Sequence, residues 1–127
     1  MNEQGIKMKA FDFDGVFVPD YQQVDIHDAL FERVWLHSKP IIEPSGDYIV
    51  ITGRSDDMLV WTWFHKHLRN TPKMVYANTN NIKPEEHKLQ TLNKLAITDF
   101  VESDLQQWDY LNKNGINCKL LKNIFNV

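Results

Sequence analysis

Short apolar runs and amphipathic stretches alternate along this chain of 127 residues. The apolar runs are rich in β-branched and aromatic residues and end in turn residues, as buried strands do, whereas apolar positions three and four residues apart indicate helices. An alternating order of strands and helices predicts a doubly wound, three-layer Rossmann-like α/β fold, with about five parallel strands between helices. Strands are expected at residues 6–13, 48–51, 74–77, 99–102 and 118–121, and helices at residues 28–37, 55–68, 84–95 and 105–113.

Helix boundaries follow from a few local signals. Ser55 is expected to be the N-cap of the helix that it precedes, and Pro84 to open the next one. Either Ser103 or Asp104 is expected to cap the last helix, which should end at Gly115. These boundaries leave polar loops directly after the carboxyl ends of the strands.

Composition narrows the class of protein. The formal net charge is −3, which argues against a protein that coats nucleic acid or an anionic membrane. The one cysteine, Cys118, permits no intrachain disulfide and no zinc cluster, which favours a reducing compartment and a cytoplasmic location. The N-terminus lacks a signal-peptide pattern, and no apolar run reaches the ~20 residues of a membrane helix. We expect residues 1–127 to form a single domain without a membrane partner.

Ligands of parallel α/β sheets bind beyond the carboxyl ends of the strands, so the residues there are the candidate site. Two carboxylates near each other can act as a nucleophile and as an acid or base, and carboxylates also bind Mg²⁺. A lysine and hydroxyl or main-chain donors suit the charge of a phosphoryl group. The residues at these ends that could supply such groups are Asp12, Asp14, Thr52, Gly53, Arg54, Glu102, Ser103 and Asp104, with Lys88 on the helix before the fourth strand.

Four motifs together resemble the haloacid dehalogenase superfamily of phosphohydrolases, in its small type without a cap domain. They are FDFDGV at residues 11–16, ITGRS at residues 51–55, Lys88, and FVESD at residues 100–104. The first motif is the most specific of the four, and its spacing to the second motif strengthens the resemblance. The resemblance extends over residues 6–121 and implies the same α/β fold.

The resemblance implies a role for each matching residue. Asp12 would be the nucleophile that takes the phosphoryl group, and Asp14 the general acid and then the general base. Thr52 would bind the phosphoryl oxygens, and Lys88 would neutralise charge on Asp12 and the phosphate. Gly53 could add a main-chain donor.

The same resemblance implies a Mg²⁺ cofactor. The ion would be held by the Asp12 carboxylate, the main-chain oxygen of Asp14 and an acid after the fourth strand. The fourth motif departs from the usual family pattern, which has aspartates there. We place Glu102 as the direct ligand and Asp104 as a more distant one, with Asp99 as the fallback.

Several alternatives remain open at the level of sequence. Lys83, before Pro84, rivals Lys88 as the phosphate lysine. Arg54 could bind substrate or only form a salt bridge. Three aromatic residues, Trp61, Trp63 and Phe64, lie close together on one predicted helix and cannot all face one core. This suggests either a contact between copies of the chain in a homo-oligomer or burial against a neighbouring helix and loop.

The intervals between motifs leave no room for a cap. Thirty-seven residues separate Asp14 from Thr52, and 35 separate Thr52 from Lys88. An open site favours a large phosphorylated substrate, macromolecular or nucleotide. Residues 16–21 are expected to form a short flap, and with residues 78–82 to set specificity.

Two functions from different classes fit these residues. The first is a Mg²⁺-dependent phosphatase that hydrolyses a phosphomonoester through an aspartyl-phosphate. The second is a non-catalytic binding or regulatory module of the same fold with a degraded metal site, which the altered fourth motif motivates. A receiver-type phosphorylation switch is ranked last, because no acid follows the third strand.

Overall fold

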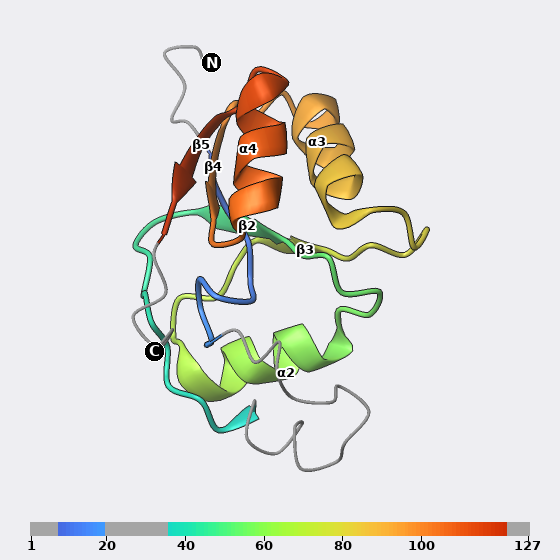
Figure 1. Ribbon diagram of the computed structural model, residues 1–127. Helices are drawn as coiled ribbons and strands as arrows, with labels where there is room; N and C mark the ends of the chain where they lie inside the picture. Colours follow the sequence, from blue (N-terminus) through green and yellow to red (C-terminus); the bar gives the residue numbers. More distant parts are fainter. Residues whose placement is uncertain (1–7, 20–35, 122–127) are drawn as a thin grey trace.

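A single parallel sheet organises the structure, a computed structural model that describes residues 8–19 and 36–121. All four strand pairs are parallel, and the strand order is β3-β2-β1-β4-β5. The predicted α/β fold with a five-stranded parallel sheet is therefore confirmed (Figure 1). The strands are β1 (Lys9–Phe11), β2 (Tyr48–Ile51), β3 (Met74–Tyr76), β4 (Asp99–Glu102) and β5 (Asn117–Leu120).

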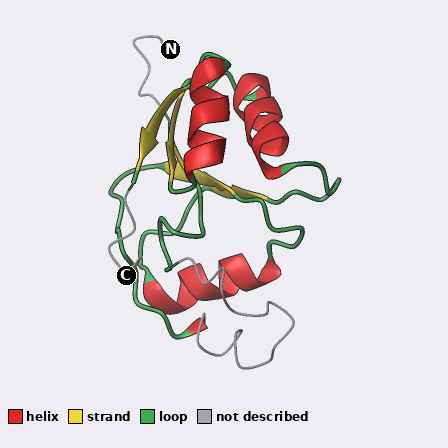
Figure 2. Cartoon of the chain, in the orientation of Figure 1, coloured by secondary structure: helices red, strands yellow, loops and turns green. Residues whose placement is uncertain are grey.

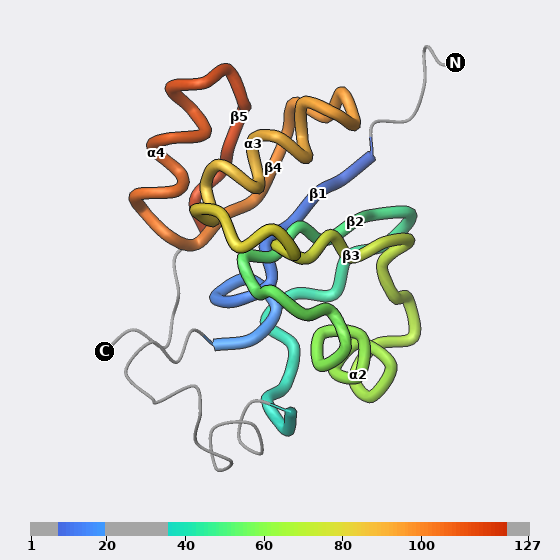
Figure 3. The backbone as a smooth tube through the Cα atoms, turned by 90° about the vertical axis from the view of Figure 1, so that its right-hand side faces the viewer, coloured from blue at the N-terminus to red at the C-terminus, as the bar shows by residue number. Residues whose placement is uncertain are grey.

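Helices cover both faces of this sheet. The described helices are α2 (Met58–His67), α3 (Pro84–Lys94) and α4 (Leu105–Lys113). Helices α3 and α4 lie side by side on one face, and α2 lies on the other (Figures 1 and 3). In the described part of the chain, the connections between strands are single helices and loops, with no inserted cap domain (Figure 2).

The two faces of the sheet carry separate apolar cores, because neighbouring side chains of a strand point to opposite faces. On β2, Tyr48 and Val50 join the core beneath α2, whereas Ile49 and Ile51 join the core beneath α3 and α4. All four are buried, as expected of a strand covered on both faces. The central strands are thus held rigidly, and their carboxyl ends are fixed.

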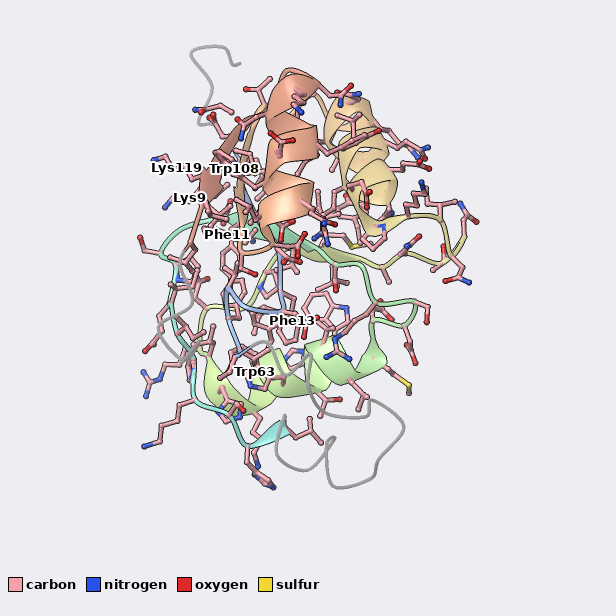
Figure 4. All side chains as sticks on the ribbon, viewed as in Figure 1. Lys9, Phe11, Phe13, Trp63, Trp108 and Lys119 are labelled. Carbon is pink, nitrogen blue, oxygen red and sulfur yellow. The ribbon has the colours of Figure 1, made fainter. Side chains whose placement is uncertain are left out.

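The turn that follows β1 is packed into the core beneath α2. Phe13 lies 5.5 Å from the ring of Trp63, and the two point toward each other in Figure 4. Gly15 adopts a φ of 82°, and its N–H donates to the main-chain oxygen of Val18 at 2.7 Å. Residues 16–18 are fully buried, so this part of the expected flap is wrong, because apolar side chains anchor the turn. Residues 20 and 21 lie outside the described residues.

The other boundaries agree well with the sequence. The predicted strands at residues 48–51 and 99–102 are confirmed, and Asp104 is the N-cap of α4. Strand β1 is shorter than expected, since the chain turns at Asp12. Most of the helix expected at residues 28–37 lies outside the described part of the chain.

The expected N-cap at Ser55 is wrong. Helix α2 begins at Met58, and its N-cap residue is Asp57. The segment before it is held instead by long-range contacts: the N–H of Asn78 donates to the main-chain oxygen of Arg54 at 2.8 Å. Tertiary contacts have therefore overridden a local capping signal.

The aromatic residues of α2 mostly face inward. Trp63 and Phe64 are fully buried, and Trp61 is partly buried against the same core. Packing within the chain thus accounts for Trp63, and the homo-oligomer stays a prediction. Among the described helices, none has the length and apolar character needed to cross a membrane.

Candidate active site

The candidate site lies where the strand order reverses. Strand β1 has β2 on one side and β4 on the other, and open α/β sheets bind their ligands at such a switch point, beyond the carboxyl ends of the strands. Phe11 of β1 is in register with Val101 of β4. The next residues along each strand, Asp12 and Glu102, therefore lie beside each other just beyond the ends of these two strands.

Lys88 joins these two carboxylates. Its Nζ atom lies 3.0 Å from Oδ1 of Asp12 and 2.7 Å from Oε1 of Glu102, and it also donates to Oε1 of Gln107 at 2.5 Å. Lys88, Asp12 and Glu102 are all buried. An ammonium group has three N–H donors, so these three acceptors satisfy it fully.

Burial and mutual charge perturb each member of this cluster. Burial, and then the charge of Glu102, raise the pKa of Asp12 well above its usual value, although Lys88 acts in the opposite direction. Burial also disfavours the ionised form of Glu102, but the charge of Lys88 and several hydrogen bonds outweigh burial, so the pKa of Glu102 is lowered. Burial opposes the charge of Lys88, yet the two carboxylates raise its pKa. These directions favour a charged Lys88 beside an ionised Glu102 and disfavour the ionised form of Asp12 in this poorly solvated place.

The loop after β4 fastens Glu102 and connects it to the turn after β1. The main-chain N–H groups of Ser103 and Asp104 donate to Oε2 of Glu102 at 3.0 and 3.1 Å. The Ser103 hydroxyl donates to the main-chain oxygen of Asp14 at 2.9 Å. The Asp104 carboxylate caps α4 by accepting the N–H of Gln107 at 2.9 Å. Asp104 therefore serves the helix, while Glu102 faces the cluster.

Asp14 is paired with Arg54 in a two-pronged contact. Nε and a terminal nitrogen of Arg54 donate to the two carboxylate oxygens at 2.9 and 2.8 Å. About a quarter of each side chain is exposed, so this pair lies nearer to solvent than Asp12. Of the two readings for Arg54, the salt bridge is the one present in the structure. Asp12 and Asp14 thus have different partners, because Phe13 between them is buried in the core.

Thr52 is buried at the end of β2, and its surroundings fix its position. Its N–H donates to the main-chain oxygen of Tyr76 at 3.0 Å, and its hydroxyl oxygen accepts the N–H of Arg54 at 3.1 Å. The Nε2 atom of His87 lies 3.1 Å from the same Tyr76 oxygen and, facing a carbonyl, must carry the hydrogen. Burial is the main cause that lowers the pKa of His87.

The residue after Thr52 has to be small. A Cβ atom at Gly53 would lie 3.1 Å from Cβ of Pro84, the first residue of α3. Gly53 therefore lets the start of α3 approach the end of β2 closely. This close contact helps to fix the position of α3 relative to the sheet, and with it the position of Lys88, one turn further along α3.

The donor set fits a hard cation such as Mg²⁺ in chemistry and charge. Asp12 and Glu102 are oxygen donors with one ammonium between them, and a divalent cation beside them would favour the ionised form of Asp12. Within the described residues, however, no three His, Cys, Asp or Glu side chains gather closely enough to hold a metal. The fit thus relies on the main-chain oxygen of Asp14, water and substrate, which is common for Mg²⁺.

The other predicted residues are placed as follows. Lys83 precedes α3 and is exposed, so Lys88 is the lysine that reaches Asp12. Asp99 stands at the opposite end of β4, where it accepts the side-chain N–H of Asn117 at 3.0 Å. The site therefore brings together Asp12, Glu102 and Lys88, with the Asp14–Arg54 pair, Thr52 and Gly53 around them.

Sequence reasoning missed three residues that hold the site together: Ser103 as a donor, His87 and Gln107. Gln107 comes three residues after the Asp104 cap, and at the level of sequence it looks like an ordinary polar residue in an exposed first turn of a helix. Nothing local indicates that Gln107 reaches across to Lys88, 19 positions earlier. These roles depend on the packing of α3 against α4.

The comparisons with known proteins add no family assignment. No protein-family model, curated protein or solved structure matches this chain.

Proposed function

We propose that this chain is a Mg²⁺-dependent phosphatase of the haloacid dehalogenase type, which hydrolyses a nucleotide or macromolecular phosphomonoester through an aspartyl-phosphate. The observation that carries this proposal is the buried Asp12 carboxylate at the switch point of the sheet, paired with Lys88 at 3.0 Å beside Glu102. A nucleophilic carboxylate needs a position that excludes bulk water and a neighbouring cation to receive an anionic substrate.

The proposed chemistry has two steps. A carboxylate oxygen of Asp12 bonds to phosphorus while the bond to the leaving oxygen breaks, and that oxygen takes a proton from Asp14. Water then attacks the aspartyl-phosphate and gives a proton to Asp14, which releases phosphate and restores the Asp12 carboxylate. The amide N–H of Gly53 and the Thr52 hydroxyl would orient the phosphoryl oxygens.

The remaining groups support the charge of this reaction. Lys88 holds Asp12 and Glu102 in place through its three hydrogen bonds. Asp12, Glu102 and the main-chain oxygen of Asp14 would hold Mg²⁺, with Asp104 more distant. The ion would supply positive charge against the phosphoryl oxygens and the buried carboxylates.

The test is hydrolysis of an aryl phosphate by the purified protein, with Mg²⁺ and with a chelator. Asp12→Asn is expected to lose turnover by several orders of magnitude while keeping the fold. Asp109→Asn is the matched control, since Asp109 is exposed on α4, away from the site, and pairs with Lys113. Full turnover by Asp12→Asn would remove Asp12 from the nucleophilic role.

The second candidate is a non-catalytic binding or regulatory module of this fold. The observation in its favour is that the site groups already satisfy one another: both oxygens of Glu102 accept hydrogen bonds, and both oxygens of Asp14 face Arg54. This candidate predicts no turnover of any phosphomonoester and no response of the protein NMR spectrum to added Mg²⁺. Metal-dependent hydrolysis would exclude it.

A further inference from the structure

Arg54 contacts both oxygens of the carboxylate that the proposed reaction needs. Its guanidinium group bonds to both oxygens of Asp14, at 2.9 and 2.8 Å, in the fork geometry that arginine favours with carboxylates. Each oxygen keeps a second lone pair, but the proton that Asp14 must carry as general acid competes with an N–H of Arg54 for one of these oxygens. Chemistry at Asp14 is therefore expected to be faster when Arg54 moves away.

The surroundings of Arg54 indicate which part moves. Its backbone is fixed, because its N–H bonds to the Thr52 hydroxyl and its carbonyl accepts the N–H of Asn78. Its side chain is about a quarter exposed. The exposed part of the long side chain can thus exchange one anionic partner for another while its backbone stays attached.

The position of the Arg54–Asp14 pair indicates what kind of ligand would displace Arg54. Lys88 is buried and fully satisfied by Asp12, Glu102 and Gln107, so it has no N–H left for a leaving group. Arg54 instead pairs with Asp14, the proposed proton donor to the leaving group, and is partly exposed. A guanidinium group gives up one carboxylate most readily for another anion of similar geometry.

Resting on the phosphatase proposed above, we propose that Arg54 is a specificity gate. It releases Asp14 when the leaving group of the substrate carries a second anionic group, a carboxylate or a phosphate, that takes over the guanidinium contact. The substrate class is then a phosphomonoester with a second negative charge on its leaving group. Substrates without that charge leave Asp14 paired with Arg54 and react more slowly.

The experiment compares substrates that differ only in this charge. Wild-type protein with Mg²⁺ is assayed on carboxyphenyl phosphates and on carbamoylphenyl phosphates of the same size, each as the meta and para isomers. We expect kcat/KM to favour the carboxylate by about tenfold or more in one isomer, the range of a charge-assisted hydrogen bond.

Variants of Arg54 then test whether this residue causes the preference for the carboxylate substrate. Arg54→Gln is expected to bring the ratio close to one, with faster turnover of the carbamoyl substrate because Asp14 is released. Arg54→Lys keeps the charge without the fork and should retain part of the preference. Lys73→Gln, an exposed lysine paired with Asp47, is the control and should keep the wild-type ratio.

Each outcome has one reading. A preference that disappears in Arg54→Gln supports the gate. A wild-type ratio near one, or a ratio that Arg54→Gln leaves unchanged, overturns the gate while the turnover itself upholds the phosphatase. No turnover of any of the four substrates by wild-type protein overturns the phosphatase and the gate together. If Arg54→Gln fails to fold, as judged by circular dichroism, the ratio in Arg54→Lys decides.

Discussion

The Nζ atom of Lys88 lies 2.7 Å from Oε1 of Glu102, and both side chains are buried. The two residues belong to α3 and β4, and they meet because β4 pairs directly with β1 and brings Glu102 beside Asp12. Three ionisable groups thereby share one poorly solvated place.

Lys88→Met should strongly destabilise the fold. It removes the one ammonium group between the carboxylates of Asp12 and Glu102, and breaking a buried ion pair in this way typically costs about 3–5 kcal/mol. The measurement is urea denaturation followed by tryptophan fluorescence. Lys113→Met is the matched control, because Lys113 forms an exposed pair with Asp109 and should change the free energy of unfolding by less than about 1 kcal/mol. Equal effects of the two substitutions would contradict the buried cluster.

His87 should make stability depend on pH in the acid range. Burial lowers the pKa of His87 in the folded protein below the usual value of 6.5, so the unfolded chain binds a proton first. The stability that this residue contributes is present above pH 6.5 and is lost as the pH falls toward the folded pKa. His87→Gln should keep a donor near Tyr76 and flatten this slope. The measurement is the denaturation midpoint of both proteins between pH 5 and pH 8. A pH dependence that is the same in His87→Gln would show that other groups cause it.

Gly53→Ala should destabilise the junction of β2 and α3. The new Cβ atom would meet Cβ of Pro84 at 3.1 Å and its Cγ at 3.4 Å, and the proline ring at a helix start cannot rotate away. We expect a loss of about 1–3 kcal/mol, the usual cost of overpacking. A double-mutant cycle with Pro84→Gly checks the cause. Additive effects of the two substitutions would mean that the contact is not responsible.

Cys118 should be unreactive in the folded protein. Burial raises the pKa of its thiol to about 12, and only 6% of the residue is exposed. Because the thiolate is the reactive form, a thiol reagent at pH 8 should label native protein far more slowly than protein in urea. Labelling at the denatured rate would indicate that β5 opens readily from the edge of the sheet.

The sequence by itself determined the elements and their order. The runs at residues 48–51 and 99–102 are strands with the expected bounds, and Asp104 caps α4 as its position suggests. These features depend on neighbours within a few residues: apolar periodicity, a cap and a turn residue. They also sufficed to place Asp12, Thr52 and Glu102 at one edge, since parallel strands in a doubly wound sheet expose their carboxyl ends together.

Only the tertiary structure decided how these residues are paired. The sequence left Lys83 and Lys88 as rivals, and the packing of α3 on Gly53 brings Lys88 to Asp12. It left Arg54 open between two roles, and the turn after β1 presents Asp14 to it. It gave no indication that Gln107 would complete the contacts of Lys88. Each pairing joins side chains from different elements, so it depends on strand order, register and helix packing, which no local pattern contains.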